Sequence, residues 1–311
     1  MSKELPLVTV GVASFNNAPY LRETLESIRL QVYAHVEIIV VDDASTDESA
    51  NVVRTWLNEH PEVNGRLICH ETNLGVCRVC NDIVTNSKGE YISIVGSDDI
   101  QLPNKLSIQV PFLQNASSET GVVFGDVEHI NSVGALIEAP VEWPKASSGD
   151  IFLALLKVNF IPAMSTLVHR KCYDKVGLYD EELGYEDWDM WLRIAREYRF
   201  LYYSPVTAHY RIHGNSATFK RRQQMLESSL KLLQKHRGHS LDANRLIASH
   251  TCQFAESLYQ IGSNQAQHWL MQAVRQSPNI MIIILLMMSV LGIPSGALGR
   301  IKNRILGGQI K

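Results

Sequence analysis

Short apolar runs alternate with amphipathic stretches over roughly the first hundred residues. Three of these runs, at residues 7–13, 36–41 and 90–95, are rich in Val and Ile and have the near-continuous apolar character of strands covered on both faces. Residues 66–70 are predicted as a further, short strand. Between them, apolar side chains recur at helical spacing, as Leu21, Leu25 and Ile28 do. Strands that alternate with helices predict an α/β fold with a mostly parallel sheet and right-handed crossovers.

The pattern becomes more mixed after residue 100. Short elements are predicted there: strands at 122–130, 164–169, 200–203 and 207–210, a turn at 131–134 toward a hairpin partner, and helices at 150–158 and 186–198. Beyond about residue 216 the spacing is helical, and residues 248–261 and 266–274 have the pattern of an antiparallel helix pair. We therefore expect a helical C-terminal region after the α/β part.

An intensely apolar run occupies residues 280–293, interrupted only by Ser289 and Gly292. The run is shorter than the roughly 20 residues that a membrane-spanning helix needs. Basic residues flank it on both sides: Arg275, Arg300, Lys302, Arg304 and Lys311. Three interpretations are open, namely a helix in a membrane interface, a buried core helix and a contact in a homodimer.

Composition narrows the classes of function. The chain has 311 residues and a formal net charge of −3, which gives no reason to expect nucleic acid as a partner. Its five cysteines do not suggest a disulfide framework, and the pair Cys77 and Cys80 lies on a predicted helix face, where packing is favoured over a metal or redox role. Met1 leads into polar residues without the apolar core of a signal peptide, so we expect a cytoplasmic protein.

Two adjacent carboxylates, Asp98 and Asp99, follow the strand predicted at 90–95. Neighbouring anions repel each other, so a cation or hydrogen-bond donors are expected beside them. The carboxyl ends of strands are also where open α/β sheets bind ligands. The structural alternative is a solvated turn that caps a following helix, with Pro103 in its first turn.

Five motifs, in this order, resemble those of the family 2 glycosyltransferases, which have the GT-A fold: V-T-V-G-V-A-S-F-N-N-A-P-Y-L, E-I-I-V-V-D-D-A-S-T-D-E-S, N-L-G-V, G-E-Y-I-S-I-V-G-S-D-D and V-G-L-Y-D-E-E-L-G-Y-E-D-W-D-M-W-L-R-I. The resemblance extends over residues 7–215. It implies a catalytic domain over 1–215, with a nucleotide-binding half at 1–100 and an acceptor half at 101–215, followed by the helical region 216–311. A Rossmann-type dehydrogenase is discarded, because no G-x-G-x-x-G follows the first strand.

The resemblance implies an inverting transfer of a sugar from a nucleotide-diphosphate donor, here a UDP-sugar, to a hydroxyl acceptor. The acceptor would be a saccharide or lipid-linked molecule of polysaccharide, O-antigen or glycolipid synthesis at the inner face of the membrane. A divalent cation would neutralise the diphosphate. The implied metal ligands are Asp99 and His213, with Asp98 reaching the ribose or the metal. Manganese is favoured over magnesium, because imidazole suits softer metals.

The nucleotide would be held at the ends of the first strands. Asp43 is the family position that accepts a hydrogen bond from a ring N–H of the base, and a capping role shared with Ser45 is compatible with it. Ser45 and Glu48 also fit the two ends of a capping box. By resemblance, five further residues line this pocket or shape its turn: Ala13, Ser14, Asn16, Asn73 and Gly75.

Asp187 is implied as the general base, which takes the proton of the acceptor hydroxyl as its oxygen attacks the anomeric carbon. Asp189 is close enough in sequence to be the base instead. Acids such as Glu186 and Asp187 are also favoured at a helix N-terminus by electrostatics alone. Trp188 and Trp191 could stack on a sugar, but their helical spacing favours core packing.

Two positions depart from the family pattern. Gly96 stands where many members have an acid, and Cys80 stands where many have Arg. Arg78, two residues before Cys80, would then supply the positive charge to the diphosphate. These departures keep a second hypothesis open, in which the chain is a non-catalytic nucleotide-binding or assembly module with the same fold.

Overall fold

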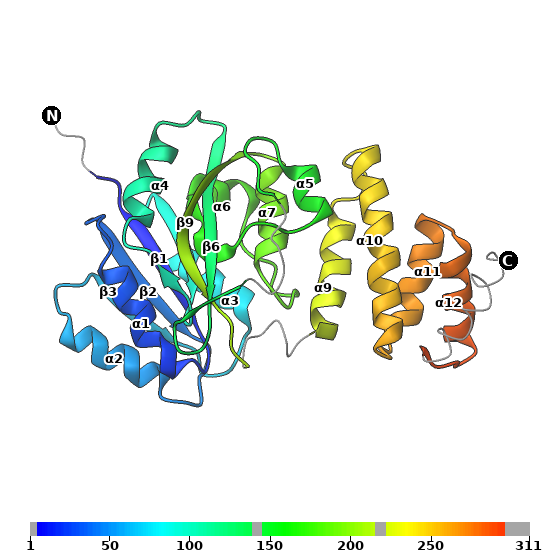
Figure 1. The fold of residues 1–311 in the computed structure, drawn as a ribbon, viewed down its shortest axis with the longest axis horizontal. Coiled ribbons are helices and arrows are strands. Elements are labelled where there is room, and N and C mark those ends of the chain that lie inside the picture. Colours follow the sequence, from blue (N-terminus) through cyan, green and yellow to red (C-terminus); the bar gives the residue numbers. More distant parts are fainter. Residues whose placement is uncertain (1–4, 139–144, 215–221, 296–311) are drawn as a thin grey trace. The chain divides into compact units, whose positions relative to one another are not determined.

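The computed structural model describes residues 5–138, 145–214 and 222–295. The chain divides into two compact units, Met1–Ser216 and Ala217–Lys311 (Figure 1). The first unit carries the sheet and the second is helical. The basic residues predicted to flank the apolar run at its C-terminal side, 300–311, lie outside the described residues.

A single nine-stranded sheet forms the centre of the first unit. Its strands have the following bounds: β1 (Val8–Ser14), β2 (Val36–Asp42), β3 (Gly65–Cys69), β4 (Tyr91–Gly96), β5 (Ile100–Gln101), β6 (Thr120–Ile130), β7 (Leu136–Ile137), β8 (Leu167–His169) and β9 (Arg199–Arg211). The strand order is β3-β2-β1-β4-β8-β6-β9-β5, with β7 paired to β6.

The four strands β3, β2, β1 and β4 are parallel, which confirms the α/β pattern predicted for the first hundred residues. In their register, Ser14 of β1 lies opposite Asp42 of β2, and Ala13 lies opposite Gly96 of β4. The carboxyl ends of β2 and β4 therefore meet on either side of the end of β1. This edge of the sheet carries the acid pair Asp42–Asp43 at the end of β2 and the acid pair Asp98–Asp99 after β4.

Helices cover both faces of the parallel strands. The helices of the first unit have these bounds: α1 (Ala18–Arg29), α2 (Ser49–Glu59), α3 (Val76–Asn86), α4 (Lys105–Gln114), α5 (Phe152–Lys157), α6 (Lys171–Val176) and α7 (Asp187–Ala195). Alternate strand residues such as Val10 and Val40 pack with α1, α2 and α4, whereas Ile39 and Val41 pack with Val79 of α3. Burial on both faces explains why the sequences of these strands are almost continuously apolar.

Three local expectations after residue 100 differ from the structure. The strands expected at 200–203 and 207–210 are one strand, β9, because the register shift opposite Gly125 and Asp126 absorbs Pro205 in a bulge. Residues 163–165 form a short 3-10 helix, η1 (Ala163–Ser165), and only β8 of the expected strand at 164–169 is extended. Pro103 was expected in the first turn of the following helix, but α4 begins two residues later, at Lys105.

The capping box expected at Ser45 and Glu48 is also wrong. Helix α2 begins at Ser49, and the side chain of the residue before it, Glu48, caps no backbone N–H. The backbone N–H and the hydroxyl of Ser45 both donate to Asp42, at 2.9 and 2.7 Å. Ser45 therefore binds Asp42 at the edge of the sheet and does not cap α2.

The second unit is a layer of helices packed side by side (Figure 1). They have these bounds: α9 (Arg222–Lys235), α10 (Leu241–Gln260), α11 (Ala266–Gln276) and α12 (Ile280–Val290). The apolar run forms α12, and one face of it is a core face, since Ile282, Leu285 and Met288 pack against α10 and α11. Among the described residues, no helix combines the length and the apolar character needed to cross a membrane.

Candidate active site

The acid pair after β2 is held by hydrogen-bond donors from three segments. Asp42 accepts from the hydroxyl of Ser14 at 3.0 Å and from both donors of Ser45. Asn16, predicted to line the nucleotide pocket, has a φ of 53° and accepts with its side-chain oxygen from the backbone N–H of Thr46 at 2.8 Å. Ser14 and Asn16 therefore act as fixed parts of the sheet edge.

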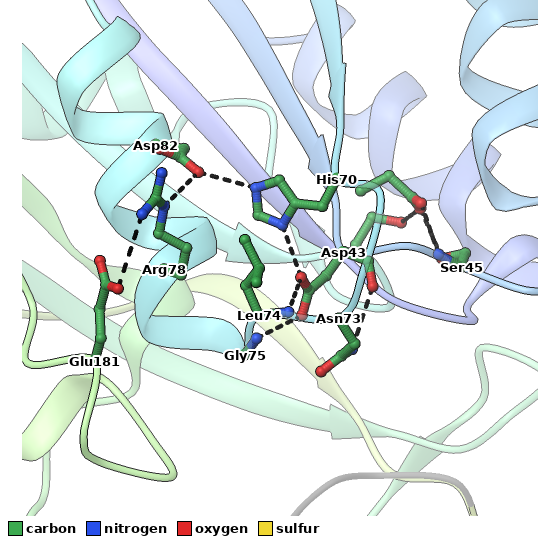
Figure 2. Close-up of polar contacts among 11 residues, drawn as sticks. Asp43, Ser45, His70, Asn73, Leu74, Gly75, Arg78, Asp82 and Glu181 are labelled. Atoms are coloured by element: carbon green, nitrogen blue, oxygen red, sulfur yellow. Dashed lines mark hydrogen bonds and ion pairs between the residues drawn. The ribbon is translucent and has the colours of Figure 1, made fainter.

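Asp43 is 3% exposed and lies at the centre of a polar network (Figure 2). Its carboxylate accepts from the backbone N–H groups of Leu74 at 2.8 Å and Gly75 at 2.9 Å. The side-chain amide of Asn73 donates to the backbone carbonyl of Asp43 at 3.2 Å. The turn at residues 73–75 needs Gly75, whose φ of 90° is unfavourable for other residues. The sequence therefore places Asn73 and Gly75 correctly beside Asp43.

His70 completes this network and was not predicted. Its Nδ1 lies 2.7 Å from Oδ1 of Asp43, and its Nε2 lies 2.9 Å from Oδ2 of Asp82. Arg78 donates to the same oxygen of Asp82 at 3.0 Å, and its Nη1 lies 3.9 Å from Glu181 (Figure 2). Arg78 is therefore already paired in this structure.

The second acid pair follows β4 and is packed around Gly96. A Cβ atom at Gly96 would lie 2.8 Å from Oδ1 of Asp98 and 3.2 Å from Oδ2 of Asp99. These two carboxylate oxygens consequently converge on the space that a side chain at residue 96 would fill. The departure from the family pattern at Gly96 thus has a steric reason in this chain.

The other oxygens of this pair are bound by the last residues of β9 and the loop after it. Oδ1 of Asp99 accepts from the backbone N–H of Arg211 at 2.9 Å, and Oδ2 of Asp98 lies 2.9 Å from Nε2 of His213. Burial, followed by the charge of Asp98, raises the pKa of Asp99 well above its ordinary range, while Arg211 opposes the shift. Asp99 and His213, predicted as metal ligands, therefore lie together with Asp98, predicted to reach the ribose or the metal.

Arg211 is a second residue that the sequence did not single out. Its guanidinium is 1% exposed and donates to the carbonyls of Asp98 at 2.7 Å and Asn131 at 3.1 Å and to the carboxylate of Glu23 at 2.6 Å. It also lies 4.9 Å from the ring centre of Tyr20. Arg211 thereby fixes the turn that carries the acid pair against β9 and α1.

The donor set of this site suits a hard divalent cation. Two carboxylate oxygens and an adjacent imidazole are ligands that such cations use, often together with phosphate oxygens of a substrate. Within residues 5–138, 145–214 and 222–295, no three His, Cys, Asp or Glu side chains gather into a complete metal site. A cation here would thus draw part of its coordination from a bound molecule.

The third acid pair begins α7. Asp187 accepts from the side-chain amide of Asn159 at 2.9 Å and from the backbone N–H of Trp188 at 2.6 Å. Burial raises the pKa of Asp187, and burial together with the charge of Asp187 raises the pKa of Glu186 to about 7. Both carboxyls line a cavity of about 20 Å³, which is enough for one water molecule.

The two candidate bases, Asp187 and Asp189, differ in their surroundings: Asp187 lines the cavity and Asp189 is paired with Arg193. Trp191 and Cys80 line the cavity beside Asp187, and the indole N–H of Trp191 has no hydrogen-bond partner among the described residues. Asp189 is 1% exposed and forms an ion pair with Arg193 at 2.8 Å. Trp188 and Trp191 are both buried, as their spacing predicted.

The sequence of the chain is similar to those of a known protein family. The family model described as glycosyl transferase family 2 matches residues 9–177. An uncharacterized glycosyltransferase of Rickettsia prowazekii is 30% identical over 218 residues, which cover 68% of this chain and 66%, just under two thirds, of that protein. An uncharacterized protein of Mycobacterium tuberculosis is 34% identical over 168 residues, covering 52% of this chain and 47% of its own length.

Solved structures show the same fold at lower identity. Residues 1–349 of S. aureus TarS in complex with UDP-GlcNAc match with a TM-score of 0.69 at 17% identity, over 90% of this chain and 84% of that one. The mannosyltransferase PcManGT of Pyrobaculum calidifontis, in complex with GDP-Man and Mn2+, matches with a TM-score of 0.59 at 19% identity, over 92% and 84%. The fold is thus the GT-A fold, and the chain belongs to glycosyl transferase family 2.

Proposed function

We propose that the chain is an inverting glycosyltransferase that moves a sugar from a nucleoside-diphosphate donor, a UDP-sugar, to a hydroxyl acceptor. The observation that carries the proposal is the convergence of Oδ1 of Asp98 and Oδ2 of Asp99 over Gly96, beside His213. The relatives TarS and PcManGT support it, since their structures contain UDP-GlcNAc and GDP-Man with Mn2+.

In this proposal the two halves of the first unit bind different substrates. Residues 1–100 bind the nucleotide, with Asp43 accepting from the base and with Ala13, Ser14 and Asn16 forming the adjoining edge. Residues 101–215 bind the acceptor. Asn73 and Gly75 hold the turn that positions Asp43.

The Asp98 and Asp99 carboxylates would hold a divalent cation, with His213 as a further ligand or as the group that orients Asp98. Such a cation neutralises the charge that develops on the diphosphate. Manganese is favoured over magnesium because an imidazole is available. Arg78 would reach a diphosphate only by leaving Asp82, so we assign it a secondary role.

Asp187 would act as the general base. Its raised pKa strengthens it as a proton acceptor once it is ionised, and Asn159 keeps one carboxylate oxygen oriented. Asp189 is assigned to structure, because Arg193 already pairs with it. The acceptor hydroxyl would give its proton to Asp187 as its oxygen attacks the anomeric carbon from the face opposite the diphosphate.

The proposed setting is cell-surface polysaccharide or glycolipid synthesis at the inner face of the cytoplasmic membrane. The outer face of α12 supports a peripheral contact with a membrane or a second copy, because Ile280, Met287 and Val290 are exposed there. Flotation with anionic vesicles and light scattering of the free protein would separate these two contacts.

A panel of nucleotide sugars tests the activity. The purified chain is expected to gain thermal stability with a UDP-sugar and Mn2+, because a ligand of the folded state raises stability, and to release UDP slowly by hydrolysis. Both effects should disappear with EDTA. Binding without UDP release in any acceptor mixture would favour the non-catalytic module, and failure to bind every donor would contradict the proposal.

A further inference from the structure

The Asp43 carboxylate has little remaining capacity to accept hydrogen bonds. A carboxylate offers about four acceptor positions, two on each oxygen. On Oδ1, the backbone N–H of Leu74 and Nδ1 of His70 occupy both positions, at 2.8 and 2.7 Å. On Oδ2, the N–H of Gly75 occupies one position at 2.9 Å. Among the partners that the described residues supply, one acceptor position of the carboxylate is therefore left, on Oδ2.

His70 holds its position on Asp43 because its other nitrogen is also bound. Nε2 of His70 lies 2.9 Å from Asp82, so each ring nitrogen faces a carboxylate oxygen (Figure 2). A carboxylate only accepts, so each of these contacts is a hydrogen bond when the ring nitrogen that makes it carries hydrogen. The polar network runs from Asp43 through His70, Asp82 and Arg78 to Glu181.

Nucleobases differ in the number of N–H donors that they present to a carboxylate. Uracil presents one ring N–H between two carbonyls, as thymine does. Guanine presents a ring N–H and an exocyclic amino group side by side, and these two donors need two acceptor positions. A carboxylate with one free position pairs fully with uracil and leaves a guanine donor without a partner.

We infer that His70 is a specificity-determining residue, which selects a uracil nucleotide over a guanine nucleotide by occupying the second free acceptor position of Asp43. The inference rests on the proposed function, in which Asp43 contacts the base. It concerns the choice of nucleotide and is independent of the sugar and the acceptor. A buried donor without a partner weakens binding by about ten- to a hundredfold, which is the expected preference for UDP over GDP.

Calorimetric titration of the full chain with UDP and with GDP, in the presence of Mn2+, tests the inference. Wild type should bind UDP at least about tenfold more tightly than GDP. His70→Phe keeps a ring of similar size without a donor, so it should narrow the ratio to within about threefold. His70→Asn is the matched control, because its amide N–H can replace Nδ1 at Asp43, and it should keep the preference.

The outcomes separate this inference from the proposed function. Equal or tighter binding of GDP by wild type overturns the inference and leaves the glycosyltransferase assignment in place. An unchanged UDP-to-GDP ratio in His70→Phe also overturns it. Binding of neither nucleotide by wild type contradicts the proposed function itself.

A measurement on wild type keeps the inference testable if His70→Phe does not fold. The ¹⁵N chemical shifts of the His70 ring report directly which nitrogens carry hydrogen. Hydrogen on both nitrogens at neutral pH supports the occupied acceptor position. A bare Nδ1 overturns the inference, because Asp43 would then have two positions for a base.

Discussion

The acid pairs Asp42–Asp43 and Asp98–Asp99 look alike in sequence but differ in their surroundings. Both lie at the carboxyl end of a buried parallel strand, at the same edge of the sheet and on either side of β1. The carboxylates of the first pair receive donors from Ser14, Ser45, His70 and the turn at 74–75. In the second pair, Asp99 accepts from the backbone N–H of Arg211, Asp98 faces the imidazole of His213, and two carboxylate oxygens of the pair crowd over Gly96.

This difference separates a pair that anchors the surrounding loops from the pair that we propose as the cation site. The first pair is already compensated by neutral donors and one imidazole, so its charges stabilise the loops around it. Burial and the charge of Asp98 make ionisation of Asp99 costly, as the raised pKa of Asp99 indicates. The pair Glu186–Asp187 resembles the second type, since both pKa values are raised.

The largest effect is expected at Asp187. Asp187→Asn should lower kcat for sugar transfer by about a thousandfold and leave the affinity for the donor within about threefold, because a general base acts only in the chemical step. Single-turnover kinetics and donor titration measure the two quantities.

Asp189→Asn is the matched control for that prediction. It removes the partner of Arg193, so it should lower the melting temperature while kcat of the folded protein stays within about tenfold. If Asp189→Asn abolishes turnover and Asp187→Asn does not, the assignment of the base is reversed.

The two acid pairs should respond to charge removal with opposite signs. Asp99→Asn is expected to raise the free energy of unfolding in EDTA by about 1–3 kcal/mol, because it removes a buried carboxylate whose charged form is disfavoured. Asp43→Asn is expected to lower it by a similar amount, about 1–3 kcal/mol, since three donors lose their charged acceptor.

The raised pKa of Asp99 also determines how the stability of the folded protein depends on pH. A raised pKa means that the folded protein binds more protons than the unfolded chain, so wild type without metal loses stability as pH rises from the ordinary aspartate range through the raised pKa. Urea unfolding of wild type and Asp99→Asn along this pH range should show the two stabilities diverging. Parallel curves would contradict the cost assigned to Asp99.

A separate effect on the pH dependence of stability is expected behind β4, where Lys105 is 1% exposed. Its ammonium nitrogen contacts Ser93 at 2.8 Å and the carbonyl of Thr166 at 2.9 Å, and burial lowers its pKa to about 7. The folded protein then binds fewer protons than the unfolded chain between about pH 7 and 10.5, so stability rises with pH in this window.

Comparison of wild type with Lys105→Met isolates this contribution. Across the window, the slope of unfolding free energy against pH should be lower in the variant by up to about 1.4 kcal/mol per pH unit. Equal slopes in the two proteins would show that Lys105 keeps an ordinary affinity for protons.

Much of the sheet edge could be predicted from the sequence. The apolar runs identified the parallel strands, because both faces of those strands are covered, and the motifs placed Asp43, Asp98, Asp99 and His213 at strand ends. The neighbouring sequence is enough to place these residues at strand ends. Their hydrogen-bond partners come from distant parts of the chain and cannot be predicted in this way.

The residues that the sequence missed act across long separations. Arg211 contacts Asp99 over 112 residues, and Asn159 contacts Asp187 over 28. His70 was missed because its role depends on α3 bringing Asp82 to the end of β3. Ser45 illustrates the opposite error, since a local capping pattern was outweighed by two hydrogen bonds to Asp42.

The central claim is that Asp98–Asp99 takes a cation and Asp42–Asp43 does not. Titration of Mn2+ followed by electron paramagnetic resonance, at saturating UDP, tests it most directly. Wild type and Asp43→Asn should each bind one Mn2+ per chain, and Asp99→Asn should weaken that binding by at least about a hundredfold. Tight binding of Mn2+ to Asp99→Asn, or its loss only in Asp43→Asn, would contradict the account.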